Sequence, residues 1–293
     1  MDSPHPRSGP LLVTGAGGVI GRRLVTRAVG EGRDVIALDR AFPAGRPAGA
    51  RVLETELRPS IGPEQPDVAA IVHLAAEMSN STDVAADSER LLAANLQSLL
   101  FTTALAPNAR RLVLASTMVV YGPPRVLPVG EDHPLEPANL YGAAKKRAEQ
   151  VAAWWGEAGD RSAASLRIAS VYGPDDPPGR AIPSFVAAVR AGRAPEVRGR
   201  VVRDYVWVDD VVAALLAAVD SDASGAFNVG TGTGTDTVDL ARAVTAAAGA
   251  ALEPDLTGDA RGTDVVLDCG RAARELGWRA EVDLAEGLRR LFA

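Results

Sequence analysis

The stretch LLVTGAGGVIGRRL, residues 11–24, decides the fold of this chain. Its leading apolar residues predict a short buried strand, and the apolar residues after the glycines recur at helical spacing. Gly15, Gly18 and Gly21 stand between the two elements with the spacing GxxGxxG. Glycines in such a turn let the backbone approach a pyrophosphate, and the helix N-terminus offers it unpaired N–H groups. The stretch therefore predicts a dinucleotide-binding turn.

The segment after this first helix supports the same interpretation. Residues 34–39, DVIALD, indicate a second buried strand that ends in Asp39. Its separation from Gly21 is close to the roughly 20 residues at which an acidic side chain meets the adenosine ribose in such sites. A carboxylate there accepts a bond from the ribose 2'-hydroxyl and repels a 2'-phosphate, which favours NAD. Arg40 could instead bind a 2'-phosphate, so NADP stays open as the cofactor. A glycine turn in an unrelated α/β unit also stays open as an alternative to the dinucleotide site.

Composition limits the classes of protein that the chain can belong to. With 293 residues and 47% hydrophobic content it can bury a large core, as one generous α/β domain or two smaller ones. Its 31 basic and 37 acidic residues give a net charge of -6 without a basic block, so we expect no nucleic-acid partner. A single cysteine, Cys269, excludes an internal disulfide and suits the reducing cytoplasm, and we expect no metal site. No apolar run reaches the roughly 18 residues of a membrane span.

The hydrophobic pattern favours a Rossmann-like α/β fold. Apolar strand segments at 67–76 and 111–115 alternate with helical patterns such as 88–106, which is typical of a parallel doubly wound sheet. The segment 41–66 is rich in Pro, Gly and Arg and indicates loop, with a possible short strand at 51–54. His73 lies inside an apolar run, and we expect it to be a packed histidine rather than a base.

Chemistry-bearing residues follow the later strands. Ser116 and Thr117 end the apolar segment RLVLAST, where ligands gather at the carboxyl ends of parallel strands. Tyr141 and Lys145 are one helical turn apart, so they share a face. An ammonium group there favours the phenolate and brings a proton-transferring tyrosine toward the working pH. The alternatives are a hydroxyl pair that only caps a turn and a surface ion pair between Lys145 and Glu149.

Taken together, GAGGVIG, the strand-ending Asp39, HLAA, ASTMVVYG and YGAAK resemble an extended short-chain dehydrogenase/reductase of the NAD-dependent epimerase/dehydratase family. The resemblance continues through LRIASVYGP, RDYVWVDDV, FNVGTG and RGTDVVLDCGRAARELGW, and so covers nearly the whole chain. It implies a doubly wound parallel sheet with a smaller C-terminal substrate-binding α/β domain. We expect the NAD-binding domain at 10–172 plus about 203–230, and the substrate-binding domain at 173–202 plus 232–293.

The resemblance also implies a role for individual residues. Tyr141 would be the acid/base, Thr117 would bond the reacting sugar oxygen, and Lys145 would bond the nicotinamide ribose and lower the pKa of the tyrosine. The implied cofactor-binding residues are Gly15, Gly18, Val19, Ile20, Gly21, Asp39, Arg40, Leu74, Ala75, Ala76, Asn95, Tyr141 and Lys145. The implied substrate-binding residues are Glu77, Thr117, Ser170, Arg203 and Arg261.

Arg203 and Arg261 match the two arginines that grip the substrate diphosphate in nucleotide-sugar members of the family. The task suits arginine, because each guanidinium can donate paired bonds to phosphate oxygens. For Arg203 the alternative is a salt bridge to Asp204 or Asp209. Trp154 and Trp155 lie on the Tyr141 helix, which often forms a dimer interface in the family. We therefore expect a homodimer, with core packing as the other explanation of the two tryptophans.

Departures from the family pattern narrow the expected reaction. Met118 and Val119 stand where 4,6-dehydratases of the family carry an Asp-Glu or Ser-Glu pair, so no carboxylic acid is placed to expel the C6 hydroxyl as water. Ser170 replaces an asparagine that often meets the substrate, so the choice of sugar is expected to differ.

The function expected from these residues is that of an NAD-dependent nucleotide-sugar epimerase acting at C4 through a 4-keto intermediate. The alternative is an NAD(P)H-dependent 4-ketoreductase of a nucleotide-linked deoxysugar. A reductase of a non-sugar carbonyl and a non-catalytic dinucleotide-binding sensor are further alternatives. The sequence names neither the sugar nor the nucleotide base.

Overall fold

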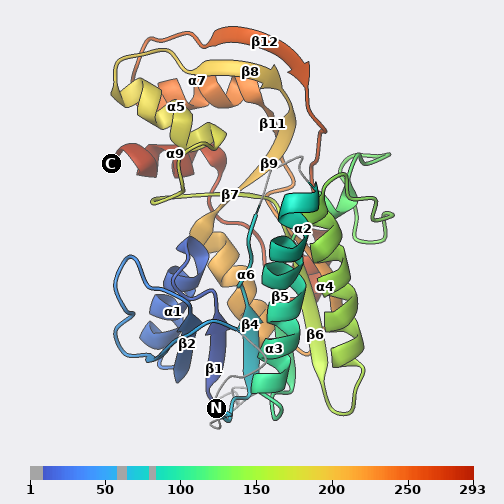
Figure 1. Ribbon diagram of the computed structural model, residues 1–293. Coiled ribbons are helices and arrows are strands. Elements are labelled where there is room, and N and C mark those ends of the chain that lie inside the picture. Colours follow the sequence, from blue (N-terminus) through green and yellow to red (C-terminus); the bar gives the residue numbers. More distant parts are fainter. Residues whose placement is uncertain (1–8, 58–64, 79–83) are drawn as a thin grey trace.

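The computed structural model describes residues 9–57, 65–78 and 84–293, and it has two lobes (Figure 1). The larger lobe surrounds a long parallel sheet, and the smaller one lies over the carboxyl ends of its strands. The elements, in chain order, are β1 (Leu11–Thr14), α1 (Val19–Gly30), β2 (Val35–Asp39), β3 (Arg51–Glu54), β4 (Ala70–His73), α2 (Val84–Leu92), the π-helical turn η1 (Ala93–Gln97), α3 (Ser98–Leu105), β5 (Arg111–Thr117), the 3-10 turn η2 (Met118–Tyr121), α4 (Leu140–Gly156), β6 (Ser162–Ile168), β7 (Ser170–Tyr172), α5 (Ala181–Arg190), β8 (Glu196–Arg200), β9 (Val202–Trp207), α6 (Val208–Asp220), β10 (Gly225–Val229), β11 (Gly234–Asp236), α7 (Thr237–Ala247), β12 (Asp255–Arg261), α8 (Gly270–Glu275) and α9 (Leu284–Phe292).

The main sheet is seven-stranded, in the order β10-β6-β5-β4-β1-β2-β3, and its neighbouring strands pair in parallel. β1 lies at the point where the order reverses: Leu12 pairs with Ile36 of β2 on one side and with Ile71 of β4 on the other. Ligands of such open sheets bind outside the carboxyl ends of the strands at this point. The prediction of a Rossmann-like, doubly wound α/β fold is confirmed.

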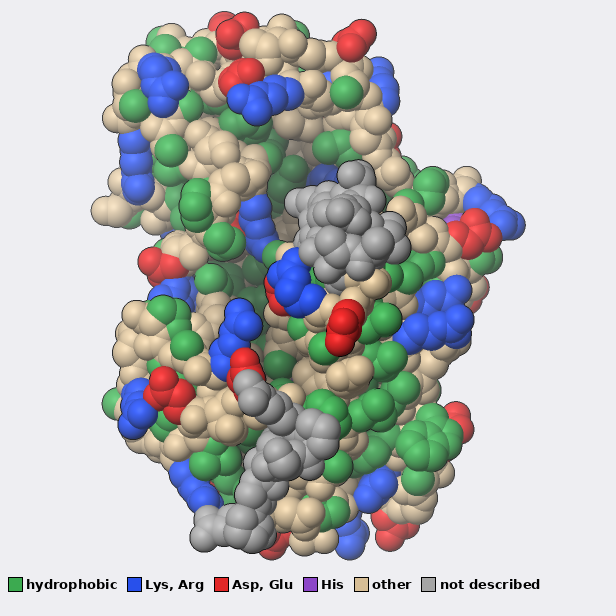
Figure 2. Space-filling model, viewed as in Figure 1, with side chains coloured by type: hydrophobic (Ala, Val, Ile, Leu, Met, Phe, Trp, Pro, Cys, Tyr) green, Lys and Arg blue, Asp and Glu red, His purple; other side chains and the backbone are tan. Residues whose placement is uncertain are grey.

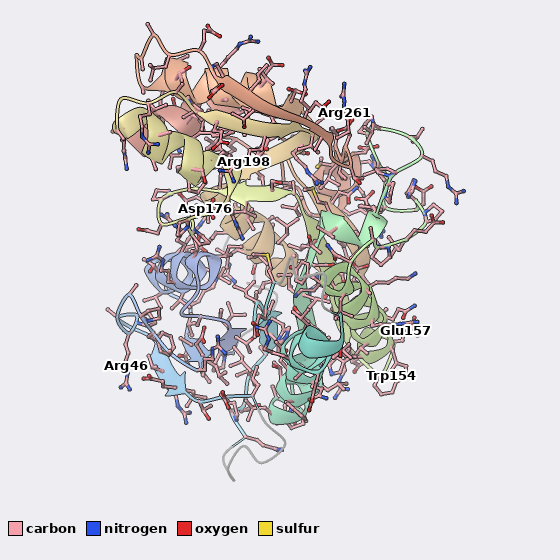
Figure 3. The ribbon with its side chains drawn as sticks, turned by 45° about the horizontal axis from the view of Figure 1, so that its top comes forward. Arg46, Trp154, Glu157, Asp176, Arg198 and Arg261 are labelled. Atoms are coloured by element: carbon pink, nitrogen blue, oxygen red, sulfur yellow. The ribbon has the colours of Figure 1, made fainter. Side chains whose placement is uncertain are left out.

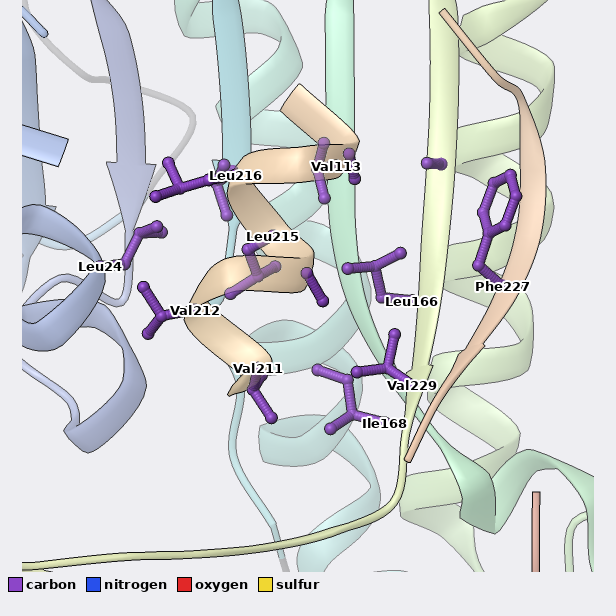
Figure 4. Packing of buried hydrophobic residues seen from close by; sticks show 14 of the residues in the cluster. Leu24, Val113, Leu166, Ile168, Val211, Val212, Leu215, Leu216, Phe227 and Val229 are labelled. Atoms are coloured by element: carbon purple, nitrogen blue, oxygen red, sulfur yellow. The ribbon is translucent and has the colours of Figure 1, made fainter. Parts of the chain in front are cut away.

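Both faces of the main sheet are covered by helices, because successive side chains of a strand point to opposite faces. Leu11 and Val13 belong to the core beneath α1 and α6, whereas Leu12 belongs to the core beneath α3 and α4. Figure 4 shows the first of these cores, in which Leu215 of α6 packs with residues of α1, β5, β6 and β10. Full burial of a leucine side chain stabilises the fold by about 1.5–3 kcal/mol.

The smaller lobe contains a three-stranded sheet, β11-β9-β7, and a two-stranded sheet, β12-β8. A third apolar cluster packs β7, β8 and β9 against α5, α7 and α9, whereas β12 is exposed along its length. The segment 203–230, expected from the sequence to belong to the NAD-binding domain, is therefore shared between the two lobes. β9 pairs with β7 and β11 in the smaller lobe, while α6 covers the main sheet and β10 forms its edge.

Several elements differ in extent from the sequence prediction. The strand expected at 67–76 is limited to β4, because after Leu74, whose N–H still bonds Thr14 of β1, the chain crosses over the β1–α1 turn. The helix expected at 88–106 begins at Val84 and is interrupted by η1. Asn95 lies in this turn, and its side-chain amide donates to the carbonyl oxygens of Glu77 (2.8 Å) and Leu91 (2.9 Å). The short strand predicted at 51–54 is confirmed as β3.

His73 ends β4 and is fully buried, which confirms that it is a packed histidine. Its Nδ1 lies 2.9 Å from the Thr14 hydroxyl and 3.2 Å from that of Thr102, and its Nε2 lies 3.2 Å from the Ser98 hydroxyl. Burial, together with the charge of Lys145, lowers the pKa of His73 to about 3. The ring is therefore neutral in the folded protein at any pH near 7, and it joins two strands to the helix above them.

Replacing this histidine should change how stability depends on acid. Between the ordinary pKa of 6.5 and about 3, the unfolded chain binds a proton at this position and the folded chain does not. The free energy of unfolding therefore falls as pH falls, by up to about 1.4 kcal/mol per pH unit from this one group. Urea unfolding between pH 8 and pH 5.5 should show a shallower dependence for His73→Asn than for the wild type. The matched control His133→Asn, at a partly exposed position, should keep the wild-type slope, and equal slopes in all three proteins would contradict this account.

Candidate active site

The turn between β1 and α1 brings backbone unusually close together. Gly15 has φ +68°, and a Cβ there would lie 2.7 Å from the Ala75 nitrogen. A Cβ on Gly21 would lie 2.1 Å from the Gly15 carbonyl oxygen. Gly18, the N-cap of α1, has no side-chain cap, and the first turn carries no acidic residue. The N–H groups at this helix end are thus left for an anion, as a pyrophosphate site requires.

Asp39 stands at the end of β2, facing this turn. Its carboxylate accepts hydrogen bonds from the backbone N–H groups of Gly17 (2.8 Å) and Arg40 (2.7 Å). Gly17 has no room for a side chain, since a Cβ would lie 2.2 Å from the Ala41 carbonyl oxygen. These contacts fix a carboxylate where the hydroxyls of an adenosine ribose would meet it. The residues present at the turn therefore fit NAD.

The other sequence-predicted cofactor residues lie around the same strand ends. Leu74 donates its N–H to the Thr14 carbonyl (3.1 Å), and Ala75, directly before Ala76, donates to the Thr14 hydroxyl (3.4 Å). Asn95 is fully buried, and its Oδ1 has no hydrogen-bond partner among the described residues. Val19 and Ile20, in contrast, turn their side chains toward the apolar cluster of the smaller lobe.

Tyr141 and Thr117 meet at the carboxyl end of β5. Thr117 ends the strand, and its hydroxyl oxygen accepts a hydrogen bond from the Val119 N–H (3.3 Å), which caps η2. Asn139 caps α4 by accepting from the Gly142 N–H (2.8 Å), so Tyr141 lies in the first turn of that helix. Burial raises the pKa of Tyr141 to about 12, while the charge of Arg180 and a hydrogen bond with Thr117 act in the opposite direction.

Lys145 lies one turn further along α4 and is buried against the end of β5. Its Nζ donates to the Ala115 carbonyl (2.9 Å), and only 1% of the residue is exposed. Burial lowers the pKa of Lys145 to about 8, and the charge of Glu149 opposes that shift. The structure therefore brings Thr117, Tyr141 and Lys145 together.

A surface ion pair of Lys145 with Glu149, the alternative considered for these residues, is wrong. Glu149 is buried and pairs with Arg167 of β6, with 2.9 Å between its Oε2 and the Nη2 of the arginine. It also accepts a hydrogen bond from the Ser116 hydroxyl. Sequence reasoning missed Arg167, although an arginine inside the otherwise apolar strand LRIAS is a signal that a buried carboxylate awaits it.

The Arg167 guanidinium extends this polar network behind the site. It donates to the Tyr121 hydroxyl (3.0 Å) and to the Glu131 carbonyl (2.8 Å). The Tyr121 hydroxyl donates in turn to the Asn228 side chain (2.6 Å). The network joins α4 to β6 and β10 and holds Glu149, one helical turn from Lys145, in a fixed orientation.

Arg203 lies on β9 without a side-chain hydrogen bond or ion pair to any residue in the described ranges. The alternative of a salt bridge to Asp204 or Asp209 is wrong. The Asp204 carboxylate accepts from the N–H groups of Thr231 (2.8 Å) and Gly232 (3.0 Å), and Asp209 pairs with Arg23 (3.0 Å). Burial lowers the pKa of Arg203, while Tyr205 and Asp264 act in the opposite direction.

The remaining sequence-predicted substrate residues are spread more widely. Arg261 ends the exposed strand β12, in register with Arg200 of β8, at the border of the smaller lobe (Figure 3). Ser170 begins β7 and is in register with Tyr205 of β9. Glu77 follows β4 and forms an ion pair with Arg90 of α2. The surface is hollowed between the two lobes, above the strand ends (Figure 2).

Comparison with known proteins agrees with this geometry. Residues 11–230 match the model of the NAD dependent epimerase/dehydratase family. The chain is 35% identical over 303 aligned positions to the UDP-glucose 4-epimerase of Mycolicibacterium smegmatis, which covers 94% of this chain and 95% of the relative. This chain belongs to the NAD-dependent epimerase/dehydratase family, as the resemblance of its motifs predicted.

Two solved structures extend the comparison. UDP-glucose 4-epimerase from Thermotoga maritima with UDP-glucose superposes with a TM-score of 0.85 at 29% identity, over 96% of each chain. MoeE5 in complex with UDP-glucuronic acid and NAD superposes with a TM-score of 0.80 at 28% identity, also over 96% of each chain. Both matches span the two lobes, so the likeness includes the arrangement of the lobes as well as the dinucleotide turn.

The close approach at Gly21 generates a prediction about cofactor binding. Gly21→Ala would push a methyl group into the Gly15 carbonyl, and overpacking of this kind costs about 1–3 kcal/mol. We expect NAD affinity, measured by isothermal titration calorimetry, to fall about 10–100-fold. Gly30→Ala, at the other end of the same helix, meets nothing within 4 Å and should bind NAD as the wild type does. Wild-type affinity in Gly21→Ala would show that the turn is not the cofactor site.

Proposed function

We propose that this protein is an NAD-dependent epimerase that inverts C4 of a nucleotide-activated sugar through a 4-keto intermediate. The observation that carries the proposal is the hydrogen-bond contact of Tyr141 with Thr117 at the end of β5, with the buried ammonium of Lys145 one turn further along the same helix. A binding protein needs no such group, because a phenol with an ammonium on the same helix face serves proton transfer. The UDP-glucose 4-epimerases among the relatives and neighbours support the choice of reaction.

The two lobes hold the substrate in complementary ways. Arg203 supplies a guanidinium without a direct ion pair among the described residues, and Arg261 a second one on the same lobe; the diphosphate of a nucleotide sugar would pair with both. The sugar then lies over the strand ends of the larger lobe. Thr117 bonds the C4 oxygen, and Tyr141 takes the proton of the C4 hydroxyl.

The protein environment must bring Tyr141 within reach of the phenolate form. Its pKa of about 12 follows from burial, and positive charge nearby lowers it. Lys145, whose pKa is about 8, is mostly an ammonium at pH 7 and lies on the same helix face. When bound, NAD would supply the hydride chemistry at C4, as acceptor from the sugar and then as donor to the opposite face of the keto sugar. Tyr141 returns the proton, so the reaction consumes no cofactor.

The surroundings of Thr117 argue against loss of water from the sugar. Met118 is buried in η2 and Val119 donates only its backbone N–H to Thr117. Neither side chain can act as the acid that 4,6-dehydration needs. In the proposed reaction the sugar therefore keeps all of its oxygen atoms.

Epimerisation should proceed without added cofactor. We expect purified protein to interconvert the C4 epimers of a UDP-linked hexose or hexuronate and to retain NAD through purification, because its hydride comes back in each cycle. Chromatography of the products and the mass of the copurified nucleotide measure both properties. A strict need for added NADH or NADPH with a 4-keto sugar would instead establish the ketoreductase alternative.

Tyr141→Phe should lower turnover by about 10²–10⁴-fold, because it removes the proposed acid/base.

The control for that variant is Tyr172→Phe, which removes a buried phenol that packs against Trp207 in the smaller lobe. It should keep turnover near the wild-type level. If Tyr141→Phe also keeps full turnover, Tyr141 is not the acid/base and the proposed mechanism is wrong.

A homodimer is part of the same proposal. Trp155 packs into the core of the larger lobe, but Trp154 is 69% exposed on the outer side of α4 (Figure 3). Leu92 and Leu100 of the neighbouring helices are 38% and 42% exposed, and apolar side chains gather on this face (Figure 2). A second copy of this face would cover them.

Charge on this helical face should break the dimer. We expect the wild type to have twice the monomer mass in light scattering coupled to size exclusion, and Trp154→Glu to have the monomer mass, because a carboxylate cannot be buried there unpaired. Trp154→Phe keeps an apolar side chain and should remain a dimer. A monomeric wild type would refute the proposal.

A cytoplasmic location stays a prediction. In the ranges that the structure describes, no helix is long and apolar enough to cross a membrane.

A further inference from the structure

Arg180 is a cation beside the proposed catalytic tyrosine that sequence reasoning did not single out. It is the N-cap of α5 and closes the loop 173–180, GPDDPPGR, which connects β7 of the smaller lobe to that helix. Its charge acts on the Tyr141 hydroxyl, which lies on the larger lobe. Arg203 and Arg261, which we assign to the diphosphate, belong to other strands of the smaller lobe.

The loop that carries Arg180 is held firmly. Asp175, with φ +65°, pairs with Arg22 of α1 at 2.6 Å between Oδ2 and Nη2. Pro174, Pro177 and Pro178 restrict the backbone on both sides of the acidic pair. The ion pair and the prolines therefore restrict the position of the loop that carries Arg180.

The donors of the Arg180 guanidinium are only partly used. Nη1 donates to the Asp176 carboxylate (2.9 Å), whose side chain is 8% exposed. Nη2 points across to the larger lobe, where its acceptor is the Met78 thioether at 3.7 Å. A thioether is a weak acceptor for a charged donor. Asp176 thus orients the guanidinium from one side, and the donors on its other side lack a strong acceptor among the described residues.

We propose that Arg180 binds a carboxylate on C5 of the substrate sugar, so that the substrates of this protein are nucleotide-activated uronic acids. The inference rests on the proposed function, because that function places C4 of the sugar at Tyr141. The substituents next to C4 are those on C3 and C5, and C5 carries the carboxylate of a hexuronate. A planar guanidinium matches a carboxylate with two parallel hydrogen bonds, which the hydroxymethyl group of a neutral hexose cannot supply.

The acidic residues close to this position do not oppose a uronate. Asp176 already pairs with Arg180, Asp175 pairs with Arg22, and Glu77, which precedes Met78, pairs with Arg90. An anionic sugar would therefore meet the side of one guanidinium that is open to solvent. The competing role for Arg180 is to act only on Tyr141, and it makes a different prediction.

The test compares UDP-glucuronate with UDP-glucose in the wild type, Arg180→Gln and the matched control Arg193→Gln, an exposed arginine just beyond the end of α5. Affinity is measured by calorimetry and kcat/KM by conversion to the C4 epimer. We expect the wild type to favour UDP-glucuronate by about 10–100-fold, the contribution of a charge-assisted pair. Arg180→Gln should remove that preference while its affinity for UDP-glucose stays within about twofold, a margin well below one such pair. Arg193→Gln should behave as the wild type.

Either of two results would overturn the inference: equal or better binding of UDP-glucose by the wild type, or a parallel loss for both sugars in Arg180→Gln. The second result would assign Arg180 to Tyr141 alone. Failure of the proposed function is seen separately, as absence of C4 inversion with both sugars. The two affinities then still decide whether Arg180 recognises the carboxylate. Asp176→Asn, which leaves the guanidinium in place but loosens its orientation, should weaken the preference partially.

Discussion

The structure of the larger lobe depends on how closely the first turn of α1 approaches the end of β1. At Gly21 and Gly15 the two segments touch backbone to backbone, and even a methyl group would overlap the carbonyl oxygen. This contact sets the direction in which α1 leaves the sheet. It also places the uncapped helix end at the point where the strand order reverses, which is where an anionic cofactor is held.

α1 then determines the position of the smaller lobe. Val19 and Ile20 pack into the apolar cluster of that lobe, while Arg22 and Arg23 pair with Asp175 and Asp209. The ion pairs are partly exposed and contribute little stability by themselves. Their value is geometric, because one helix offers its N-terminus to the cofactor and braces the loop that presents Arg180. Cofactor and sugar recognition are thereby fixed relative to each other.

Buried charge has a comparable role behind the catalytic residues. The ion pair of Glu149 and Arg167 is buried. A buried ion pair is weak evidence for stability, because the cost of desolvation offsets the attraction between its charges. Here it fixes α4 against β6 and keeps a negative charge one turn from Lys145, which opposes the effect of burial on the lysine. Lys145 can then remain an ammonium one helical turn from Tyr141. The polar network thus supports the chemistry more than it supports the fold.

The sequence by itself determined the features that depend on neighbours along the chain. Apolar runs, helical spacing and glycines predicted the order of strands and helices as far as the Tyr141 helix, and the separation of four residues placed Tyr141 and Lys145 on one helix face. Local patterns of this kind report the period of an element and the side chains one turn away. They also pointed to Asp39 as a cofactor-binding candidate, since a residue that ends a parallel strand lies at the carboxyl end of the sheet, where ligands bind.

Only the tertiary structure decided which charges are buried and which partners they have. The sequence left open a surface ion pair for Glu149 and a salt bridge for Arg203. The sheet brings Arg167 against Glu149, and both aspartates near Arg203 are used elsewhere. Arg180 meets Met78 across 102 positions of sequence, and Asp175 meets Arg22 across 153. Such contacts follow from the packing of two lobes, and no periodicity in the chain encodes them.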